Sequence, residues 1–198
     1  MEILQSGGGS SIYLNHKSGK KCFFRGKDEI CEFDYMQIDP ATIKTGWGYY
    51  DKAKESFVEV WDKEAGSITE RPGEQYRKGF SMWVKVDSEE EPLLWQRFSA
   101  GEFASFKQIV GLFWFQHEAE KPKLPVVKLR RDKDGQEDVR EEPNWGNGVN
   151  IAQFDFVHFS DRDPAFVIPA DTSESNNAAE EPAEQKEEKV ITKEEIPF

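Results

Sequence analysis

Alternation of apolar and polar residues is the dominant pattern along the chain. In residues 78–86 the alternate positions from Phe80 to Val86 are apolar, and the positions between them are Ser81, Trp83 and Lys85. Successive side chains of a β-strand point to opposite faces of a sheet, so a period of two predicts strands. Six segments share this period, namely residues 31–38, 56–61, 78–86, 93–98, 126–131 and 151–159.

One segment follows a helical period instead. Ser99 and Glu102 have the spacing of a capping box, in which the serine oxygen accepts from the amide of residue 102 and the glutamate reaches back. Pro122 prevents the helix from continuing further. The apolar positions that recur at helical spacing are Phe103, Phe106, Ile109, Val110 and Phe113.

Strands, one helix and then further strands follow each other in this order along the chain. This order predicts a mainly β fold like an oligonucleotide-binding (OB) barrel, in which one α-helix lies between the third and fourth strands. Other small β-barrels and β-sandwiches have the same strand pattern and remain open as alternatives. We therefore expect one OB-fold-like β-barrel with a single α-helix.

The composition divides the chain into three parts. Residues 1–10 contain Gln-Ser-Gly-Gly-Gly-Ser and are expected to be flexible. Residues 11–170 form the expected folded domain. Residues 171–198 have no aromatic residue before the last position and are rich in Glu, Ala, Ser and Asn, so they cannot bury enough apolar area to fold. We expect them to form a disordered acidic C-terminal tail.

The net charge of −12, from 38 acidic and 26 basic side chains, at first opposes a nucleic-acid partner. Nine of the acidic and three of the basic groups lie in residues 171–198, so half of the net charge belongs to the tail. The acids of the tail can mimic phosphate and compete for the same surface. The charge therefore does not exclude DNA, although binding must depend on stacking and on local basic groups.

Neither a membrane span nor an export signal is visible in the sequence. No apolar run approaches the roughly 20 residues that a membrane helix needs, and the first residues lack a basic region followed by an apolar core. Cys22 and Cys31 are too few for a disulfide framework and match no zinc pattern, so we expect reduced thiols. The expected location is the cytoplasm of a bacterium or of a phage-infected host, with no membrane partner.

Signals of catalysis are weak. His16, His117 and His158 do not have the spacing of metal ligands, and no nucleophile elbow, phosphate loop or dinucleotide fingerprint is present. The glycine-rich segments Gly46-Trp47-Gly48 and 145–148 are interpreted as turns. We therefore expect a protein that is not an enzyme and that has no catalytic residue, no metal and no cofactor.

Aromatic and basic residues two positions apart point to nucleic acid. Trp83 with Lys85, and Trp95 with Arg97, place an indole and a cation on the same face of a strand. A base that stacks on an aromatic ring gains about 1–3 kcal/mol whatever its identity, while a cation meets the adjacent phosphate. The alternative is that these rings form a second packing layer. The predicted DNA-binding residues are Phe57, Trp61, Arg77, Trp83, Lys85, Trp95, Arg97, Lys128 and Arg130.

The chain ends in an apolar tip behind acidic residues. Its last five residues are Glu194, Glu195, Ile196, Pro197 and Phe198, and such a tip can fill a hydrophobic pocket while its carboxylates meet basic groups. This ending resembles the C-terminal tip of bacterial single-stranded DNA-binding proteins (SSBs). The resemblance implies that the tip binds replication, recombination and repair proteins and that the tail can fold back on the DNA-binding surface.

The predicted domain is longer and richer in tryptophan than the tetrameric bacterial SSBs. The overall plan is more similar to the divergent proteins of phages and mobile elements, which combine a single barrel with an acidic, aromatic-terminated tail. A monomer or dimer is therefore favoured over a tetramer. We expect a sequence-nonspecific single-stranded DNA-binding protein that acts in DNA replication, recombination and repair. The alternatives are a β-sandwich that binds carbohydrate on its aromatic face and a protein-binding adaptor.

Overall fold

The computed structural model describes residues 12–17, 20–54, 56–64, 67, 69–142 and 149–169. All of these except Pro169 belong to one compact unit, Met1–Ile168. Within the described part the chain is mainly β with one α-helix, as predicted. The flexible segment predicted for residues 1–10 and the tail predicted for residues 171–198 both lie outside the described residues.

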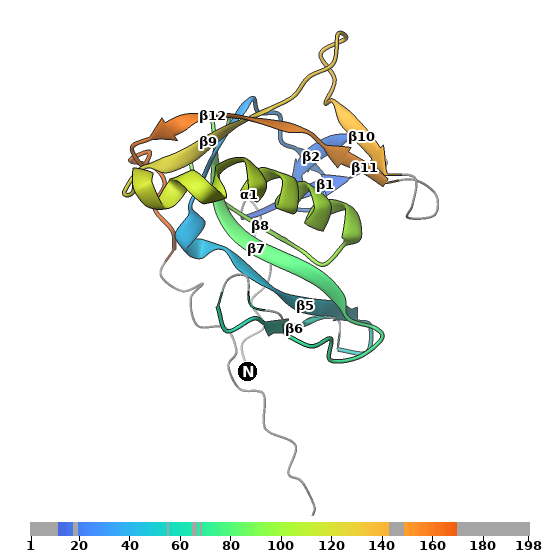
Figure 1. The fold of residues 1–198 in the computed structure, drawn as a ribbon. Helices are drawn as coiled ribbons and strands as arrows, with labels where there is room; N and C mark the ends of the chain where they lie inside the picture. Colours follow the sequence, from blue (N-terminus) through green and yellow to red (C-terminus); the bar gives the residue numbers. More distant parts are fainter. Residues whose placement is uncertain are drawn as a thin grey trace, which may run out of the picture. The chain divides into compact units, whose positions relative to one another are not determined.

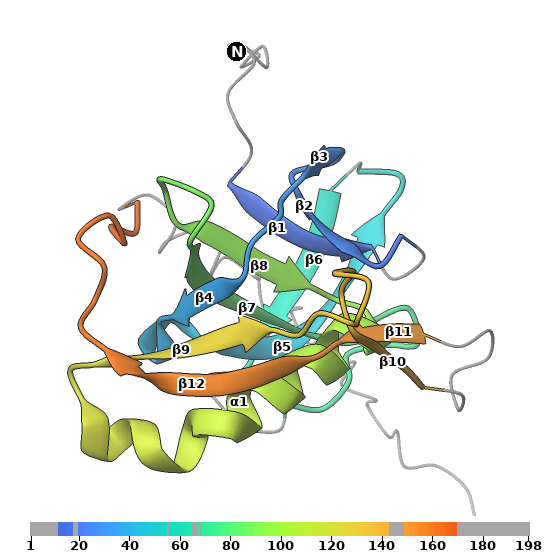
Figure 2. The ribbon, with the colours of Figure 1, turned by 90° about the horizontal axis from the view of Figure 1, so that it is seen from above.

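Ten strands form one large sheet, which curls into a half-barrel (Figures 1 and 2). A separate two-stranded hairpin is formed by β10 (Val139–Glu142) and β11 (Val149–Ala152). The strands of the large sheet are β1 (Tyr13–Lys17), β2 (Cys22–Arg25), β3 (Glu29–Ile30), β4 (Tyr35–Ile38), β5 (Lys44–Asp51), β6 (Ser56–Trp61), β7 (Arg77–Val86), β8 (Leu93–Arg97), β9 (Leu124–Leu129) and β12 (Phe154–Ser160).

The main path through the sheet runs in the order β12-β9-β4-β7-β8-β1-β2-β3. All neighbours on this path are antiparallel except β1 and β8, which are parallel. The short 3-10 helix Pro40–Thr42 separates β4 from β5, and both strands pair with the same edge of the long strand β7. Strand β6 then pairs with the other edge of β5.

The helix α1 (Ala100–Glu120) lies across the concave side of the curled sheet (Figure 1). Its residues Phe106, Ile109 and Phe113 are buried in the main hydrophobic core. That core also receives Phe80 and Met82 from β7. We call the side of the sheet that packs on α1 the inner face, and the opposite side the outer face.

The predicted start of the helix is confirmed in part. Ser99 is the N-cap, and its side chain accepts from the backbone N–H of Glu102. The Glu102 side chain, however, hydrogen-bonds Trp95 and Arg97 of β8, and those bonds hold the helix start against the sheet. The helix ends at Glu120, just before Pro122. Among the described residues, no helix is both long and apolar enough to cross a membrane.

A second, smaller apolar cluster covers part of the outer face. It consists of Trp83, Leu94, Leu124 and Phe166, with Ile12 and Ile168 packed against it. The chain after β12 therefore returns over the outer side of β7 and β8. Because of this cover, both faces of that part of the sheet are buried.

The strands predicted from the period of two are present, with two differences. Residues 151–159 belong to two strands, β11 and β12, and Gln153 lies between them. The tripeptide Gly46-Trp47-Gly48, interpreted as a turn, is the middle of strand β5. This interpretation was wrong because the glycines serve close packing within a strand: the backbone of β6 leaves no room for a Cβ on Gly46, and the ring of Phe98 leaves none on Gly48.

Gly111 offers a test of the helix on its own. It lies at an exposed position of α1, and no heavy atom would lie within 4 Å of an added Cβ. Replacing glycine by alanine in a helix interior gains about 1 kcal/mol, since alanine loses less backbone entropy. We expect Gly111→Ala to raise the free energy of unfolding by about that amount in urea titrations. A lower free energy would show that the helix is not formed as described.

Candidate functional site

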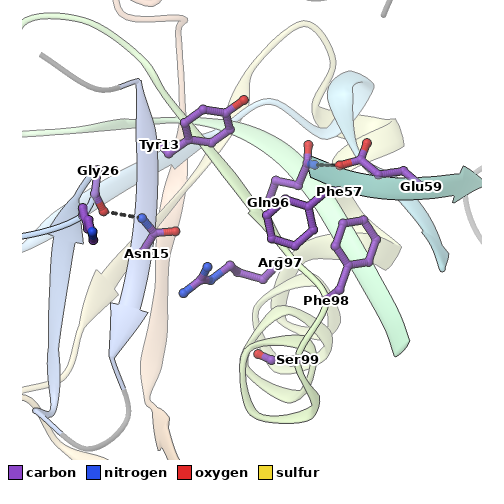
Figure 3. A pocket seen from close by; sticks show the side chains of 10 residues that line it. Tyr13, Asn15, Gly26, Phe57, Glu59, Gln96, Arg97, Phe98 and Ser99 are labelled. Carbon is purple, nitrogen blue, oxygen red and sulfur yellow. Dashed lines mark hydrogen bonds between the residues drawn. The ribbon is translucent and has the colours of Figure 1, made fainter. Parts of the chain in front are cut away.

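A pocket of about 810 Å³ opens on the outer face of β8, between β1 and β6 (Figure 3). Figure 3 shows Tyr13 and Asn15 on one side and Phe57, Glu59 and Phe98 on the other. This part of the outer face is not covered by the second apolar cluster, which contains Trp83 and Phe166. The pocket is lined by Tyr13, Asn15, Gly26, Lys27, Phe57, Glu59, Gln96, Arg97, Phe98 and Ser99.

Glycines of two strands create the space in which Phe98 lies. A Cβ on Gly48 would lie 2.6 Å from Cε1 of Phe98, and a Cβ on Gly79 would lie 2.2 Å from its Cδ1. Gly46 is equally restricted, since its Cβ would lie 2.4 Å from the carbonyl oxygen of Val60. The benzyl ring of Phe98 therefore rests directly on the backbone of β5 and β7.

Four aromatic rings form a row beside the pocket. The ring centroids of Tyr50 and Phe57 are 5.3 Å apart, those of Phe57 and Phe98 are 6.1 Å apart, and those of Phe98 and Trp61 are 5.4 Å apart. Phe57 is 54% exposed and Tyr50 is 49% exposed. We call Tyr50, Phe57, Phe98 and Trp61 the aromatic row. It presents ring surface to solvent next to a pocket, as a stacking platform requires.

Glu59 is the acidic group of the pocket. Its carboxylate accepts a hydrogen bond from Trp61 Nε1 at 3.2 Å and another from Gln96 Nε2. Burial raises the pKa of the Glu59 carboxyl, and the two hydrogen bonds and the cation of Lys44 oppose that rise. The carboxylate is thus held in a fixed position at the wall of the pocket.

Two basic residues line the pocket, at the end of β8 and in the turn after β2. Arg97 donates from Nε to the Glu102 carboxylate at 2.7 Å, so its guanidinium group is anchored at the start of α1. Lys27 lies in the turn between β2 and β3. Asn15 Nδ2 donates to the carbonyl oxygen of Gly26 at 2.5 Å, which fixes that turn against β1.

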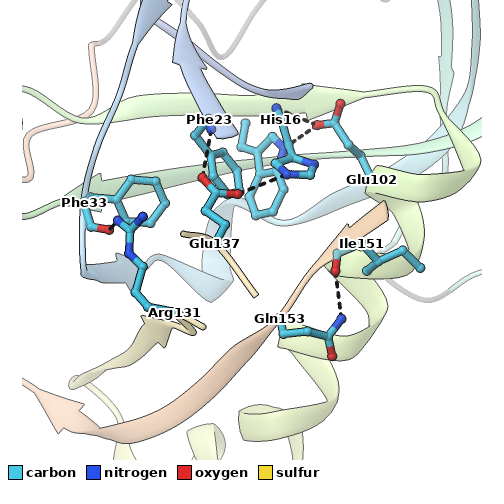
Figure 4. Close-up of polar contacts among 9 residues, drawn as sticks. His16, Phe23, Phe33, Glu102, Arg131, Glu137, Ile151 and Gln153 are labelled. Atoms are coloured by element: carbon cyan, nitrogen blue, oxygen red, sulfur yellow. Dashed lines mark hydrogen bonds and ion pairs between the residues drawn. The ribbon is translucent and has the colours of Figure 1, made fainter. Parts of the chain in front are cut away.

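A buried network below the pocket ties β1 to α1 and to the loop between β9 and β10 (Figure 4). Glu102 accepts from Trp95 Nε1 at 2.7 Å and from the backbone N–H of His16 at 3.5 Å. The ring of His16 contacts the Glu137 carboxylate at 3.2 Å, and Glu137 also accepts from the N–H of Phe23. These contacts hold β1 in place, and β1 provides one wall of the pocket.

Three of the predicted DNA-binding residues come together at this site. Phe57 and Arg97 line the pocket, and Trp61 belongs to the aromatic row beside it. Residues that the sequence analysis missed complete the site. Phe98 directly follows the predicted Arg97, and the glycines of β5 and β7 were the only signal for its position. The other missed residues are Tyr13, Asn15, Lys27, Tyr50, Glu59 and Gln96.

Trp95, Trp83 and Lys85 were expected on an exposed face, and this expectation was wrong. Trp95 is fully buried in the main core, because the strand register places it opposite Met82 on the inner face. Trp83 points to the outer face but is only 6% exposed, because it packs with Phe166 in the second apolar cluster. Lys85 is buried and donates to the carbonyl oxygens of Val86 and Glu89. Trp83 thus belongs to the second packing layer that the sequence left open, whereas Trp95 belongs to the main core.

The remaining predicted basic residues are exposed but do not line the pocket. Arg77 donates to the backbone carbonyls of Glu74 and Tyr76 at the start of β7. Lys128 lies over the ring of Tyr35, 5.5 Å from its centroid.

Arg130, also on the outer side of the β9 region, is paired with Asp155. The predicted partner-binding residues Glu194, Glu195, Ile196, Pro197 and Phe198 lie outside the described residues.

The whole chain was compared with models of known families, with curated proteins and with solved structures. None of the three comparisons gives a match.

Proposed function

We propose that this protein binds single-stranded DNA on the outer face of an OB-type barrel. The strand order supports the fold, when β4 and β5 are counted as one strand interrupted by the 3-10 helix. The path β12-β9-β4-β7-β8 then corresponds to strands 5-4-1-2-3 of an OB fold, with α1 between the third and fourth strands. Strands β1, β2 and β3 extend the sheet at the edge of β8.

The observation that carries the proposal is the position of the aromatic row. OB folds bind oligonucleotides on the face of their second and third strands and with the loop that joins the first two. In this chain these elements are β7, β8 and the connection that contains β6. The row formed by Tyr50, Phe57, Phe98 and Trp61 lies on this connection and on the neighbouring strands.

The charge of the domain limits how the strand is held. Residues 1–170 contain 29 acidic and 23 basic side chains, so broad electrostatic attraction is weak. Stacking on the aromatic row then supplies most of the affinity, with Lys27 and Arg97 close to the backbone phosphates. The proposed role in replication, recombination and repair keeps the tip 194–198 as the segment that docks partner proteins.

Intrinsic fluorescence tests the proposal directly. Trp61 is in the aromatic row, whereas Trp83 and Trp95 are buried elsewhere. We expect oligo-dT at low salt to quench the fluorescence of the wild type, and most of this quenching to disappear in Trp61→Phe but not in the control Trp83→Phe. Phe57→Ala should weaken binding between about 5- and 150-fold, the equivalent of one stacked base.

Two results would contradict the proposal. The first is the absence of any binding of oligo-dT at low salt. The second is a loss of quenching in Trp83→Phe with none in Trp61→Phe, which would place the strand on the covered half of the outer face. Retention on a polysaccharide, with no response to DNA, would instead favour the carbohydrate-binding alternative.

A further inference from the structure

The wall of the pocket presents hydrogen-bond acceptors at fixed positions. A carboxylate oxygen accepts about two hydrogen bonds, and each oxygen of Glu59 receives one, from Trp61 or from Gln96. Both oxygens therefore retain acceptor capacity. Among the described residues, nothing donates to the amide oxygens of Asn15 and Gln96. The polar lining of this wall is thus suited to a ligand that donates hydrogen bonds.

Aromatic rings surround these acceptors. Phe57 and Phe98 stand on the same side of the pocket as Glu59, and Tyr13 stands opposite (Figure 3). Phe98 cannot move back, because it rests on Gly48 and Gly79. A flat ligand that enters the pocket therefore finds ring surfaces for its faces and a carboxylate for its edge.

The four bases differ in the edge that they offer to a carboxylate. Guanine carries two adjacent donors, N1–H and the N2 amino group, which match the two oxygens of one carboxylate. Adenine and cytosine each place a ring nitrogen acceptor beside their amino group. Thymine flanks its N3–H with two carbonyl oxygens, which a carboxylate repels. Only guanine can thus satisfy both oxygens of Glu59 at once.

We propose that this pocket is a guanine-selective subsite within the single-stranded DNA-binding surface, and that Glu59 is its specificity-determining residue. The inference rests on the proposed binding of single-stranded DNA and adds a base preference to it. The rings of the aromatic row accept any base, whereas the pocket distinguishes one base from the others. Arg97 also lines the pocket, with its guanidinium group anchored to Glu102, and the proposal places it close to the phosphate of the inserted nucleotide.

The first test uses the wild-type protein and oligo-dT in which one central thymidine is replaced. A single guanosine should tighten binding between about 5- and 150-fold, the discrimination expected of one bidentate contact. Inosine lacks the N2 amino group and should lose most of this gain, and adenosine should show none. Equal affinity for all these oligonucleotides would overturn the guanine subsite while leaving DNA binding intact. Failure to bind any of them would overturn the proposed function.

The second test changes Glu59 itself. Glu59→Gln preserves the shape of the side chain, and the Gln96 amide can rotate to present its oxygen to the new donor. The readout is the ratio of the affinities for guanosine-containing and all-thymidine strands, which should fall close to one. The matched control is Glu118→Gln on the exposed surface of α1, which should keep the wild-type ratio. A wild-type ratio in Glu59→Gln would contradict the role of Glu59, and inosine tests the subsite even if that variant does not fold.

Discussion

Replacing Glu102 by alanine should lower the free energy of unfolding by about 1–3 kcal/mol, the cost typical of leaving buried donors without an acceptor. The Glu102 carboxylate is buried and accepts from Trp95 Nε1, from Arg97 Nε and from the backbone N–H of His16. Alanine would leave the buried donors of Trp95 and His16 without an acceptor, and unsatisfied buried donors are costly. Urea unfolding of the purified variant measures the effect.

Glu118 provides the matched control on the same helix. Its carboxylate is exposed and is paired with Lys121 and with the ring of the neighbouring His117, and pairs made by an exposed carboxylate contribute little to stability. Glu118→Ala should therefore change the free energy of unfolding by less than about 1 kcal/mol. If Glu102→Ala were as harmless as Glu118→Ala, the network below the pocket would not hold the sheet and helix together.

Replacing Gly79 by alanine should impair both stability and the proposed binding of DNA. The added Cβ would lie 2.2 Å from Cδ1 of Phe98 and 2.4 Å from the carbonyl oxygen of Arg97. The second of these atoms is backbone, so the strand pair β7–β8 must shift. Overpacking of this kind costs about 1–3 kcal/mol. Displacement of Phe98 removes the centre of the aromatic row, and we expect the affinity for oligo-dT to fall at least about fivefold, as for one lost stack.

The same substitution at Gly111 is the control for this prediction, because the space around that residue is open. It should leave the affinity for oligo-dT at the wild-type value. Fluorescence titration and urea unfolding of both variants separate the two effects. A Gly79→Ala variant with wild-type stability and affinity would show that Phe98 does not rest on β7.

Local patterns in the sequence predicted much of the fold. The period of two located β4, β6, β7, β8 and β9, and the spacing of Ser99 and Glu102 located the start of α1. The pattern could not say which face of a strand is covered. In β7 both faces are buried, since the second apolar cluster, which contains Phe166, packs on the side opposite the main core. Trp83 was for this reason mistaken for an exposed residue.

The candidate site was predictable only in part, because strand pairing assembles it. Phe57 and Arg97 could be recognised from their own segments. Tyr13 reaches the site through the parallel pairing of β1 with β8, and no local signal indicates that pairing. Register decides the rest: Trp95 lies opposite Met82 and therefore faces inward, whereas the sequence suggested only that it shares a face with Arg97.

The contact between His16 and Glu137 spans 121 residues of sequence and has a consequence for the time course of folding. A ribosome adds about 5–20 residues per second, so Glu137 is made about 6–24 seconds after His16. Until β8 has been made, β1, β2 and the two-residue strand β3 have only one another as partners, and such a small sheet is marginally stable in water. Strand β1 can join the rest of the sheet once β8 is made, and the buried contact that closes the network below the pocket forms only after Glu137 has been added.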